Sequence, residues 1–169
     1  MGWAKGVPRK PNRIELNGET AKIFLSSGHI ATIDAEDVER VRPYSWHAVF
    51  AKNGVYACSK TGGKATYLHR LIAETPDGLD TDHRDGDGLN NRRRNLRPAT
   101  ESQNLLNVGP RKGKRFKGIF ARPSGFVVRA PLANGKQKYL GTVKTAEQAA
   151  MIYDSYVAEN CSEFARKNF

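Results

Sequence analysis

The chain of 169 residues is long enough for one ordinary domain or two small ones, and its hydrophobic content of 38% permits a core of normal size. Its 28 Lys and Arg outnumber 17 Asp and Glu, and the formal net charge of +11 is typical of proteins that bind a polyanion, nucleic acid above all. It contains no long apolar run, signal-peptide pattern or lipidation motif, so we expect a cytoplasmic protein with no membrane partner. Cys58 and Cys161 can form neither a disulfide framework nor a zinc knuckle, so we expect no structural zinc.

The N-terminal half begins with basic residues, prolines and glycines, which predict a flexible basic arm over residues 1–13. Beyond the arm, apolar and polar residues alternate between turn signals, which favours short antiparallel strands. The expected strands are 19–25, 29–33, 45–50, 54–60 and 64–69, with a short helical insertion at 34–41. We identify no chemical role for residues 13–66 by themselves.

The stretch from Arg70 to Asn107 is rich in glycine, aspartate and asparagine, which predicts a long loop rather than regular structure. Long ordered loops are usually functional. The capping-box sequence Thr100–Gln103 predicts that a short helix begins near Glu101 and carries Asn104. Residues 108–115 combine cations with two glycines and a proline and are expected to form a basic linker.

Three strands and a helix are expected in the C-terminal part. The strands are 117–121, 126–130 and 137–143, joined by the turn sequence RPSG and by an Asn134-Gly135 hairpin turn. A second capping box begins at Thr145, and one helical face after it carries Ala149, Ile152, Tyr153, Tyr156 and Val157. These elements predict a small α+β domain.

The densest chemical cluster is the pair Asp82-His83, followed by Asn95 and Asn104. Hydrolysis of a phosphodiester needs a base beside the attacking water and a cation that neutralises the developing charge. Carboxylate and amide oxygens are hard ligands that suit magnesium or manganese, and a neutral imidazole can accept a proton near neutral pH.

The sequences LHRLIAE and TDHRDGDGLNNRRRNLRPATESQN resemble the HNH nucleases of phage and intron-encoded homing endonucleases. The resemblance covers roughly residues 67 to 107 and implies a β-hairpin and a helix around one divalent ion, Mg²⁺ or Mn²⁺. It implies that Asp82 and Asn104 are metal ligands, that His83 is the general base and that Asn95 pins the intervening loop. Asn104 replaces the final His of the family name, which favours an ion with oxygen ligands over zinc.

Several of these residues have other interpretations. His83 and Asp82 outside the motif would be a surface histidine and a turn-former, and Asp85 with Asp87 resembles the start of a calcium loop that lacks its bidentate acid. His69 either packs or contacts phosphate. The three cations Arg92, Arg93 and Arg94 are either a solvated charge run or phosphate contacts.

Residues 116–169 resemble the apetala-type DNA-binding domain of plant ethylene-response factors, which also occurs beside phage HNH motifs. The resemblance rests on Lys117-Gly118-Ile119, Arg122, Gly125, Tyr139-Leu140-Gly141-Thr142, Thr145-Ala146-Glu147, Ala149-Ala150, Tyr153-Asp154 and Asn168-Phe169. It implies a three-stranded sheet that lies in the major groove and is braced by the helix. Arg129, Ser124, Phe120 and Pro131 depart from the plant pattern, so the plant recognition sequence does not transfer.

Strand alternation assigns the two faces of this sheet independently. The residues expected to face the helix are Ile119, Ala121, Val128, Ala130 and Leu140, and those expected outward are Arg122, Val127, Arg129, Gln137 and Tyr139. Arginine and glutamine can hydrogen-bond base edges. Expected DNA contacts are therefore Arg122, Arg129, Gln137 and Tyr139 on the sheet, with Arg111, Lys112, Lys114, Arg115 and Lys117 from the linker onward. The alternative is an ordinary exposed sheet with scattered charges.

These observations predict an α+β protein with two modules: hairpin-rich strands and a ββα-metal nuclease motif over 14–107, and the DNA-binding domain over 116–169. The predicted activity is metal-dependent hydrolysis of duplex DNA by a homing or site-preferring HNH endonuclease without a small-molecule cofactor, in the bacterial host if the gene is phage-encoded. The sequence does not determine the oligomeric state, although a monomer is slightly favoured. The main alternative is a non-catalytic, sequence-specific DNA-binding regulator, and an RNA-directed protein ranks below it because outward Arg and Gln suit the duplex major groove.

Overall fold

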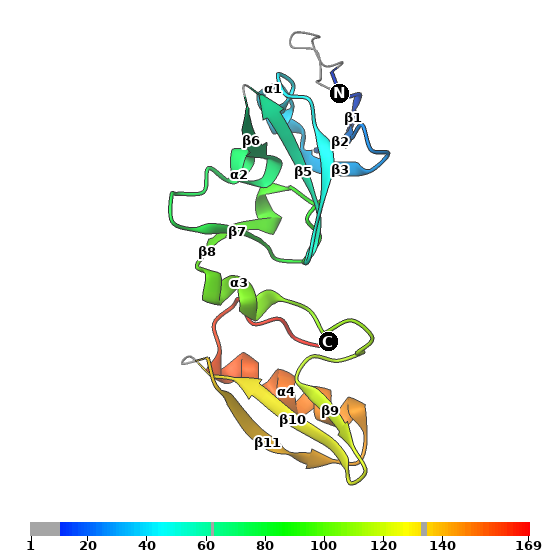
Figure 1. Ribbon diagram of the computed structural model, residues 1–169, viewed down its shortest axis with the longest axis vertical. Coiled ribbons are helices and arrows are strands. Elements are labelled where there is room, and N and C mark those ends of the chain that lie inside the picture. Colours follow the sequence, from blue (N-terminus) through cyan, green and yellow to red (C-terminus); the bar gives the residue numbers. More distant parts are fainter. Residues whose placement is uncertain (1–10, 62, 133–134) are drawn as a thin grey trace. The chain divides into compact units, whose positions relative to one another are not determined.

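The computed structural model describes residues 11–61, 63–132 and 135–169, and the chain divides into two compact units between Pro98 and Ala99 (Figure 1). The expected mixed α+β class is confirmed by several small sheets and short helices. Within the described ranges, no helix has the length and apolar character needed to cross a membrane. The short helix that ends at Asn107, which we expected to close the nuclease module, belongs in this division to the second unit.

Two three-stranded antiparallel sheets form most of the first unit. One has the strand order β1–β2–β3, with β1 at Ile14–Asn17, β2 at Thr20–Phe24 and β3 at Ile30–Asp34. The other has the order β4–β5–β6, with β4 at His47–Ala51, β5 at Gly54–Thr61 and β6 at Lys64–Tyr67. The five expected strands are therefore confirmed, except that Leu68 and His69 belong to a helix.

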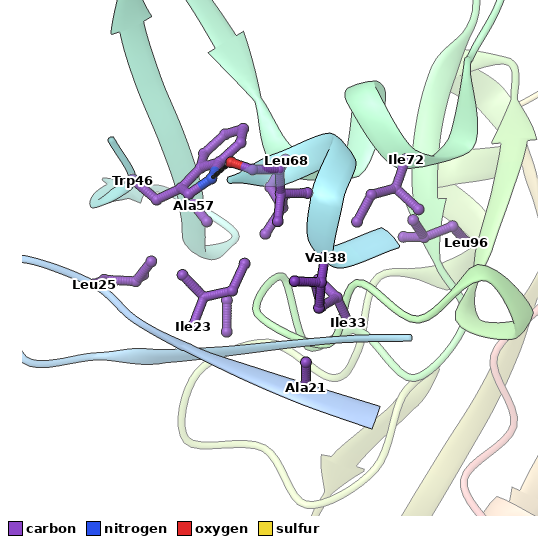
Figure 2. Close-up of a cluster of buried hydrophobic side chains, with 12 residues drawn as sticks. Ala21, Ile23, Leu25, Ile33, Val38, Trp46, Ala57, Leu68, Ile72 and Leu96 are labelled. Atoms are coloured by element: carbon purple, nitrogen blue, oxygen red, sulfur yellow. Dashed lines mark hydrogen bonds between the residues drawn. The ribbon is translucent and has the colours of Figure 1, made fainter. Parts of the chain in front are cut away.

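The core of the first unit joins these sheets to two short helical segments. The expected insertion at 34–41 is confirmed as the 3₁₀ turn η1, Ala35–Asp37, and the helix α1, Val38–Val41. Trp46 is fully buried, and its indole Nε1 donates to the Val41 carbonyl at 3.0 Å. Figure 2 shows the converging apolar side chains, which include Ile23, Ile33, Val38, Ala57, Leu68, Ile72 and Leu96.

The prediction of one long loop from Arg70 to the capping box at Thr100 is wrong. This stretch contains most of helix α2, Leu68–Ala73, and the two-stranded sheet of β7, Asp80–His83, and β8, Leu96–Ala99. Each strand has only four residues, too few for apolar alternation to be visible. The sequence of β7 is also entirely polar, yet its last three side chains are buried.

The expected basic arm lies mostly in residues 1–10, outside the described residues. From Asn12 on the chain is held in place, which corrects the expected end of the arm at Arg13. The Asn12 side chain donates to the carbonyls of Phe24 and Trp46, both at 2.9 Å, and accepts from the Trp46 amide at 2.6 Å. Three hydrogen bonds from one amide side chain tie this segment to two strand ends.

The second unit begins with helix α3, Glu101–Asn107, which has the expected capping box. The Thr100 hydroxyl accepts from the Gln103 amide at 3.3 Å, and the Gln103 side chain accepts from the Thr100 amide at 2.8 Å. The end of α3 is fixed within the same unit, because the Leu106 carbonyl accepts from the Arg166 amide at 3.1 Å and from Lys117 Nζ at 2.5 Å.

The three expected C-terminal strands and the helix are confirmed. The antiparallel sheet has the order β11–β10–β9, with β9 at Ile119–Arg122, β10 at Gly125–Pro131 and β11 at Gln137–Val143. Helix α4, Ala146–Asn160, covers one face of this sheet (Figure 1), and the core between them includes Ile119, Val128, Ala130, Ala149, Ala150, Tyr153 and Val157. Ala121 departs from the expected face assignment because it is exposed on the edge strand. The Asn134 position of the expected hairpin turn lies outside the described residues.

Candidate functional site

Asp82 and His83 are adjacent residues at the end of β7, and both are buried, with exposed fractions of 3% and 5%. A surface histidine and a solvated turn aspartate would be exposed, so burial separates this pair from the ordinary interpretation of such residues. The chain then forms a loop that returns to β8, and the Arg84 amide donates to the Asn95 carbonyl at 2.9 Å, which closes the base of the loop.

The imidazole of His83 has a buried amide partner. Its Nε2 lies 3.4 Å from Oδ1 of Asn91, which is fully buried. An amide oxygen only accepts hydrogen bonds, so Nε2 carries a hydrogen and, in the neutral ring, Nδ1 carries the lone pair. Burial lowers the pKa of His83 from its ordinary value, against opposing contributions from Asn91, Asp85, Asp82 and Asp87. The ring is therefore neutral at neutral pH and able to accept a proton.

A cluster of rings surrounds His83 on the side of β5 and α2. His69, from α2, makes an edge contact with His83 at a centroid distance of 5.2 Å and stacks on Tyr67 at 5.4 Å. Tyr56 contacts both histidine rings, at 5.6 and 5.9 Å. Burial, followed by the nearby His83 and Arg70, lowers the pKa of His69 to about 3. Of the two interpretations of His69, the geometry fits packing.

The carboxylate of Asp82 is paired with a buried arginine from the neighbouring strand. Arg97 Nε donates to Asp82 Oδ2 at 2.8 Å, and the two side chains are 7% and 3% exposed. Breaking such a pair leaves an uncompensated buried charge, so each partner fixes the other. The ion pair thereby holds Asp82 in one orientation at the end of β7.

Asn95 is the hub of the loop between β7 and β8. Its Nδ2 donates to Asp85 Oδ1 at 2.9 Å and to the Asn90 carbonyl at 2.8 Å, and its Oδ1 accepts from the Asp85 amide at 3.1 Å. Asp85 and Asp87 also cap amides within the loop, at 2.8 and 2.9 Å. These two acids accept hydrogen bonds from amides two residues further along the same loop. Their spacing is therefore explained by turns within the loop and requires no calcium ion.

The N-terminal strands anchor this same loop. Thr32 of β3 exchanges backbone hydrogen bonds with it: the Thr32 amide donates to the Leu89 carbonyl at 2.9 Å, and the Asn91 amide donates to the Thr32 carbonyl at 2.7 Å. On the other side of the loop, a Cβ added at Gly88 would lie 2.4 Å from the Val55 carbonyl oxygen, so only glycine allows this approach. Residues 13–66, which showed no chemistry of their own, therefore position the loop that does.

Two of the three consecutive arginines are bound within the first unit, contrary to the expectation of phosphate contacts. Arg92 Nε donates to Asp34 at 2.7 Å. Arg93 donates to buried Asp37 from Nη2 at 2.6 Å and from Nε at 3.0 Å. Arg94 is exposed. The Arg92 side chain is 19% exposed at its ion pair, whereas that of Arg93 is 46% exposed and is held by two hydrogen bonds to Asp37, so Arg93 and Arg94 both have the exposure expected of a phosphate contact.

Sequence reasoning missed Asn91, Arg97, Asp34 and Asp37 as parts of this site. Asn91 follows another asparagine, and nothing local distinguishes the buried one from its neighbour. The ion pairs of Arg92 and Arg93 join residues 56 to 58 positions apart, so no spacing rule indicates them. The sequence does contain a signal for Arg97, because a cation that is buried in a strand requires an acidic partner.

The other expected site residues lie in the second unit. Asn104 is half-buried on α3, where its amide donates to the Thr100 carbonyl at 2.9 Å. Lys117 is half-buried and bound to the Leu106 carbonyl, and Arg115 is bound to Glu147 at 2.6 Å, so both differ from freely available phosphate contacts. The remaining expected DNA contacts, Arg111, Lys112, Lys114, Arg122, Arg129, Gln137 and Tyr139, are all exposed.

The donor set suits a hard divalent ion better than a soft one. In the part of the chain that the structure describes, no three His, Cys, Asp or Glu side chains gather closely enough to hold a metal by themselves. Magnesium needs only one or two protein carboxylates, since it keeps several waters and binds substrate phosphates. Asp82 supplies a fixed carboxylate, so the residues fit magnesium or manganese.

Comparison with known proteins gives the family. The family model of HNH endonuclease matches residues 66–106, which include Asp82, His83, Asn95 and Asn104. An uncharacterized HNH endonuclease of Acanthamoeba polyphaga mimivirus is 32% identical over 147 residues, which cover 83% of this chain and 75% of that protein. The chain belongs to the HNH endonuclease family. No solved structure matches this HNH endonuclease.

Proposed function

We propose that this HNH endonuclease hydrolyses phosphodiester bonds in duplex DNA, with His83 as general base and one divalent ion, Mg²⁺ or Mn²⁺, bound by Asp82 and Asn104. The observation that carries the proposal is the buried, neutral His83 beside a fixed carboxylate and an orienting amide. A general base requires a pKa below the working pH and a fixed orientation, and burial and Asn91 supply these two properties.

In the proposed reaction, Nδ1 of His83 accepts the proton of the attacking water, because Nε2 donates to Asn91. Arg97 holds the Asp82 carboxylate in one orientation, from which it would bind the ion, and Asn95 maintains the shape of the loop around both residues. A bound divalent ion would neutralise the negative charge that develops on the scissile phosphate. The HNH family name and the donor set support this assignment.

The second unit is proposed to hold the duplex and to favour particular sites, as in homing endonucleases. Its outward sheet face presents the exposed side chains of Arg129, Gln137 and Tyr139, and the segment before the sheet presents Arg111, Lys112 and Lys114. Cations that contact phosphate supply salt-dependent affinity, and arginine and glutamine read base edges. The likeness of residues 116–169 to the apetala-type domain supports this part of the proposal.

Supercoiled plasmid incubated with the full chain tests the proposal, with and without magnesium. We expect nicked or linear product only with the ion, and His83→Ala is expected to slow cleavage by about a hundredfold or more while DNA affinity is kept. His29→Ala, at a histidine that contacts Phe50 rather than the site, is the matched control. DNA binding without cleavage under any of these conditions would favour the regulator instead.

A further inference from the structure

A cavity of about 380 Å³ lies in the second unit, where residues of the sheet, of α3 and the segment after it, and Tyr153 of α4 line it. Phe120, Arg129 and Gln137 line its sheet side, one from each strand. Phe120 pairs with Val127 across the sheet, next to buried Ile119 and Val128, so the phenyl ring lies on the face away from the core. The cavity is therefore at one end of the face that the proposed function assigns to DNA.

A second part of the cavity wall comes from α3 and the residues after it. Leu105, Leu106 and Val108 line this wall, and two of them are unusually exposed for apolar side chains, Leu105 at 61% and Val108 at 41%. The wall is held in place by the two hydrogen bonds to the Leu106 carbonyl described above. The cavity is thus lined both by apolar side chains of this segment and by the phenyl ring of Phe120.

The charge on the cavity has one sign. Among the described residues that line it are four cations, Arg111, Lys114, Lys117 and Arg129, and no acid. Arg129 lies 5.8 Å from the centroid of the Phe120 ring, so one guanidinium borders the apolar part directly. A ligand with a flat apolar body and an attached anionic group would match both properties.

We propose that this cavity binds one unstacked nucleotide of the DNA substrate. The base would lie against Phe120 and the apolar wall of α3, its edge within reach of Gln137, while Arg111 and Lys114 contact the flanking phosphates. Extruded bases are held in this way, by stacking on aromatic and apolar side chains with hydrogen bonds to the base edge. This inference rests on the proposed function for its choice of DNA as the occupant.

Binding to two duplexes of one sequence tests the inference, one fully paired and one with a single additional unpaired nucleotide. EDTA is added to prevent cleavage by the full chain, and binding is measured by fluorescence anisotropy. The duplex with the unpaired nucleotide should bind about tenfold more tightly, because its additional nucleotide is already unpaired and the free energy of unstacking a paired base is not needed. Phe120→Ala and Leu105→Ala should each remove most of this preference and leave affinity for the paired duplex within about twofold. Leu105 is mostly exposed, so its truncation tests the cavity without disturbing the core.

Met151→Ala is the matched control, since Met151 is 63% exposed on α4 and does not line the cavity. Equal affinity for the two duplexes, or a preference that survives both cavity variants, would overturn the inference and leave the proposed function intact. Stronger binding of poly-glutamate than of the unpaired duplex would assign the cavity to an acidic peptide and overturn it too. Absence of binding to either duplex would contradict the proposed function itself.

Discussion

The two units of this HNH endonuclease use their cations in opposite ways. In the first unit, Arg92, Arg93 and Arg97 are bound to acids, two of which are almost fully buried. In the second unit, Lys114 and Arg129 are exposed on the side proposed to meet DNA. The formal net charge of +11 is therefore not a measure of the DNA-binding surface. The three bound arginines of the first unit stabilise a loop, whereas Lys114 and Arg129 of the second unit remain available to a ligand.

Removing an internal cation should have the largest effect. Arg97→Met removes the cation that is paired with the buried Asp82 carboxylate, so the free energy of unfolding should fall by about 3–5 kcal/mol. Urea denaturation measures the change, and Arg122→Met, at an exposed cation of the second unit, should change stability by less than about 0.5 kcal/mol. Adding Asp82→Asn to Arg97→Met should recover much of the stability but no cleavage. Equal effects of the two arginine substitutions would remove the contrast between the units.

Acid should act on the first unit selectively, because all 4 histidines of the chain lie there. The pKa of His69 is about 3 in the folded chain and near 6.5 when unfolded, owing first to burial. A lowered pKa means that the unfolded chain binds more protons between these values, so stability is complete above pH 6.5 and falls as the pH decreases. The expected loss is about 3 kcal/mol by pH 4.5.

His69→Phe should reduce this pH dependence, since phenylalanine fits a ring cluster and does not titrate, and the part that remains is expected from His83, whose pKa is also lowered by burial. Denaturation curves at several pH values compare it with the native chain, and His29→Phe is the control that should leave the acid loss in place. A pH profile that is the same in the native chain and in His69→Phe would assign the loss to other groups.

Asn91→Ala should lower the cleavage rate about tenfold, with DNA affinity unchanged, because it removes the acceptor that orients His83. Single-turnover rates and anisotropy separate the two quantities. Asn91→Asp keeps an oxygen in the same place and should retain more activity than Asn91→Ala. The positioning role would be refuted by an alanine variant that cleaves at the native rate.

The smallest effect should come from single exposed cations. Lys114→Ala should reduce the slope of log affinity against log salt by about one, with little change in stability. Arg93→Ala should instead lower the stability and leave the salt slope nearly unchanged, because its guanidinium group is bound to Asp37. A salt slope that falls equally in both variants would show that Arg93 leaves its partner when DNA binds.

The sequence predicted most of what depends on neighbouring residues. Strand alternation located five strands of the first unit, and the side chain of Thr100 forms the capping box that its sequence predicts. Composition and strand alternation did not predict the polar strand β7, because its burial depends on partners elsewhere in the chain, such as Arg97. Asp34 and Asp37 were missed for the same reason: an ordinary acid in a helical turn becomes essential to the loop only when the fold brings distant arginines to it.

The backbone hydrogen bonds between Thr32 and the loop that joins β7 to β8 determine whether the nuclease motif can be transferred to another protein by itself. The family model spans residues 66–106, but the loop inside that span receives hydrogen bonds from β3, and its arginines depend on acids at positions 34 and 37. A segment transplanted by the limits of the motif would carry the reactive imidazole without the scaffold that shapes its surroundings. Grafts or minimal nucleases made from this chain should therefore begin at Asn12, where the first fixed side chain joins the strands.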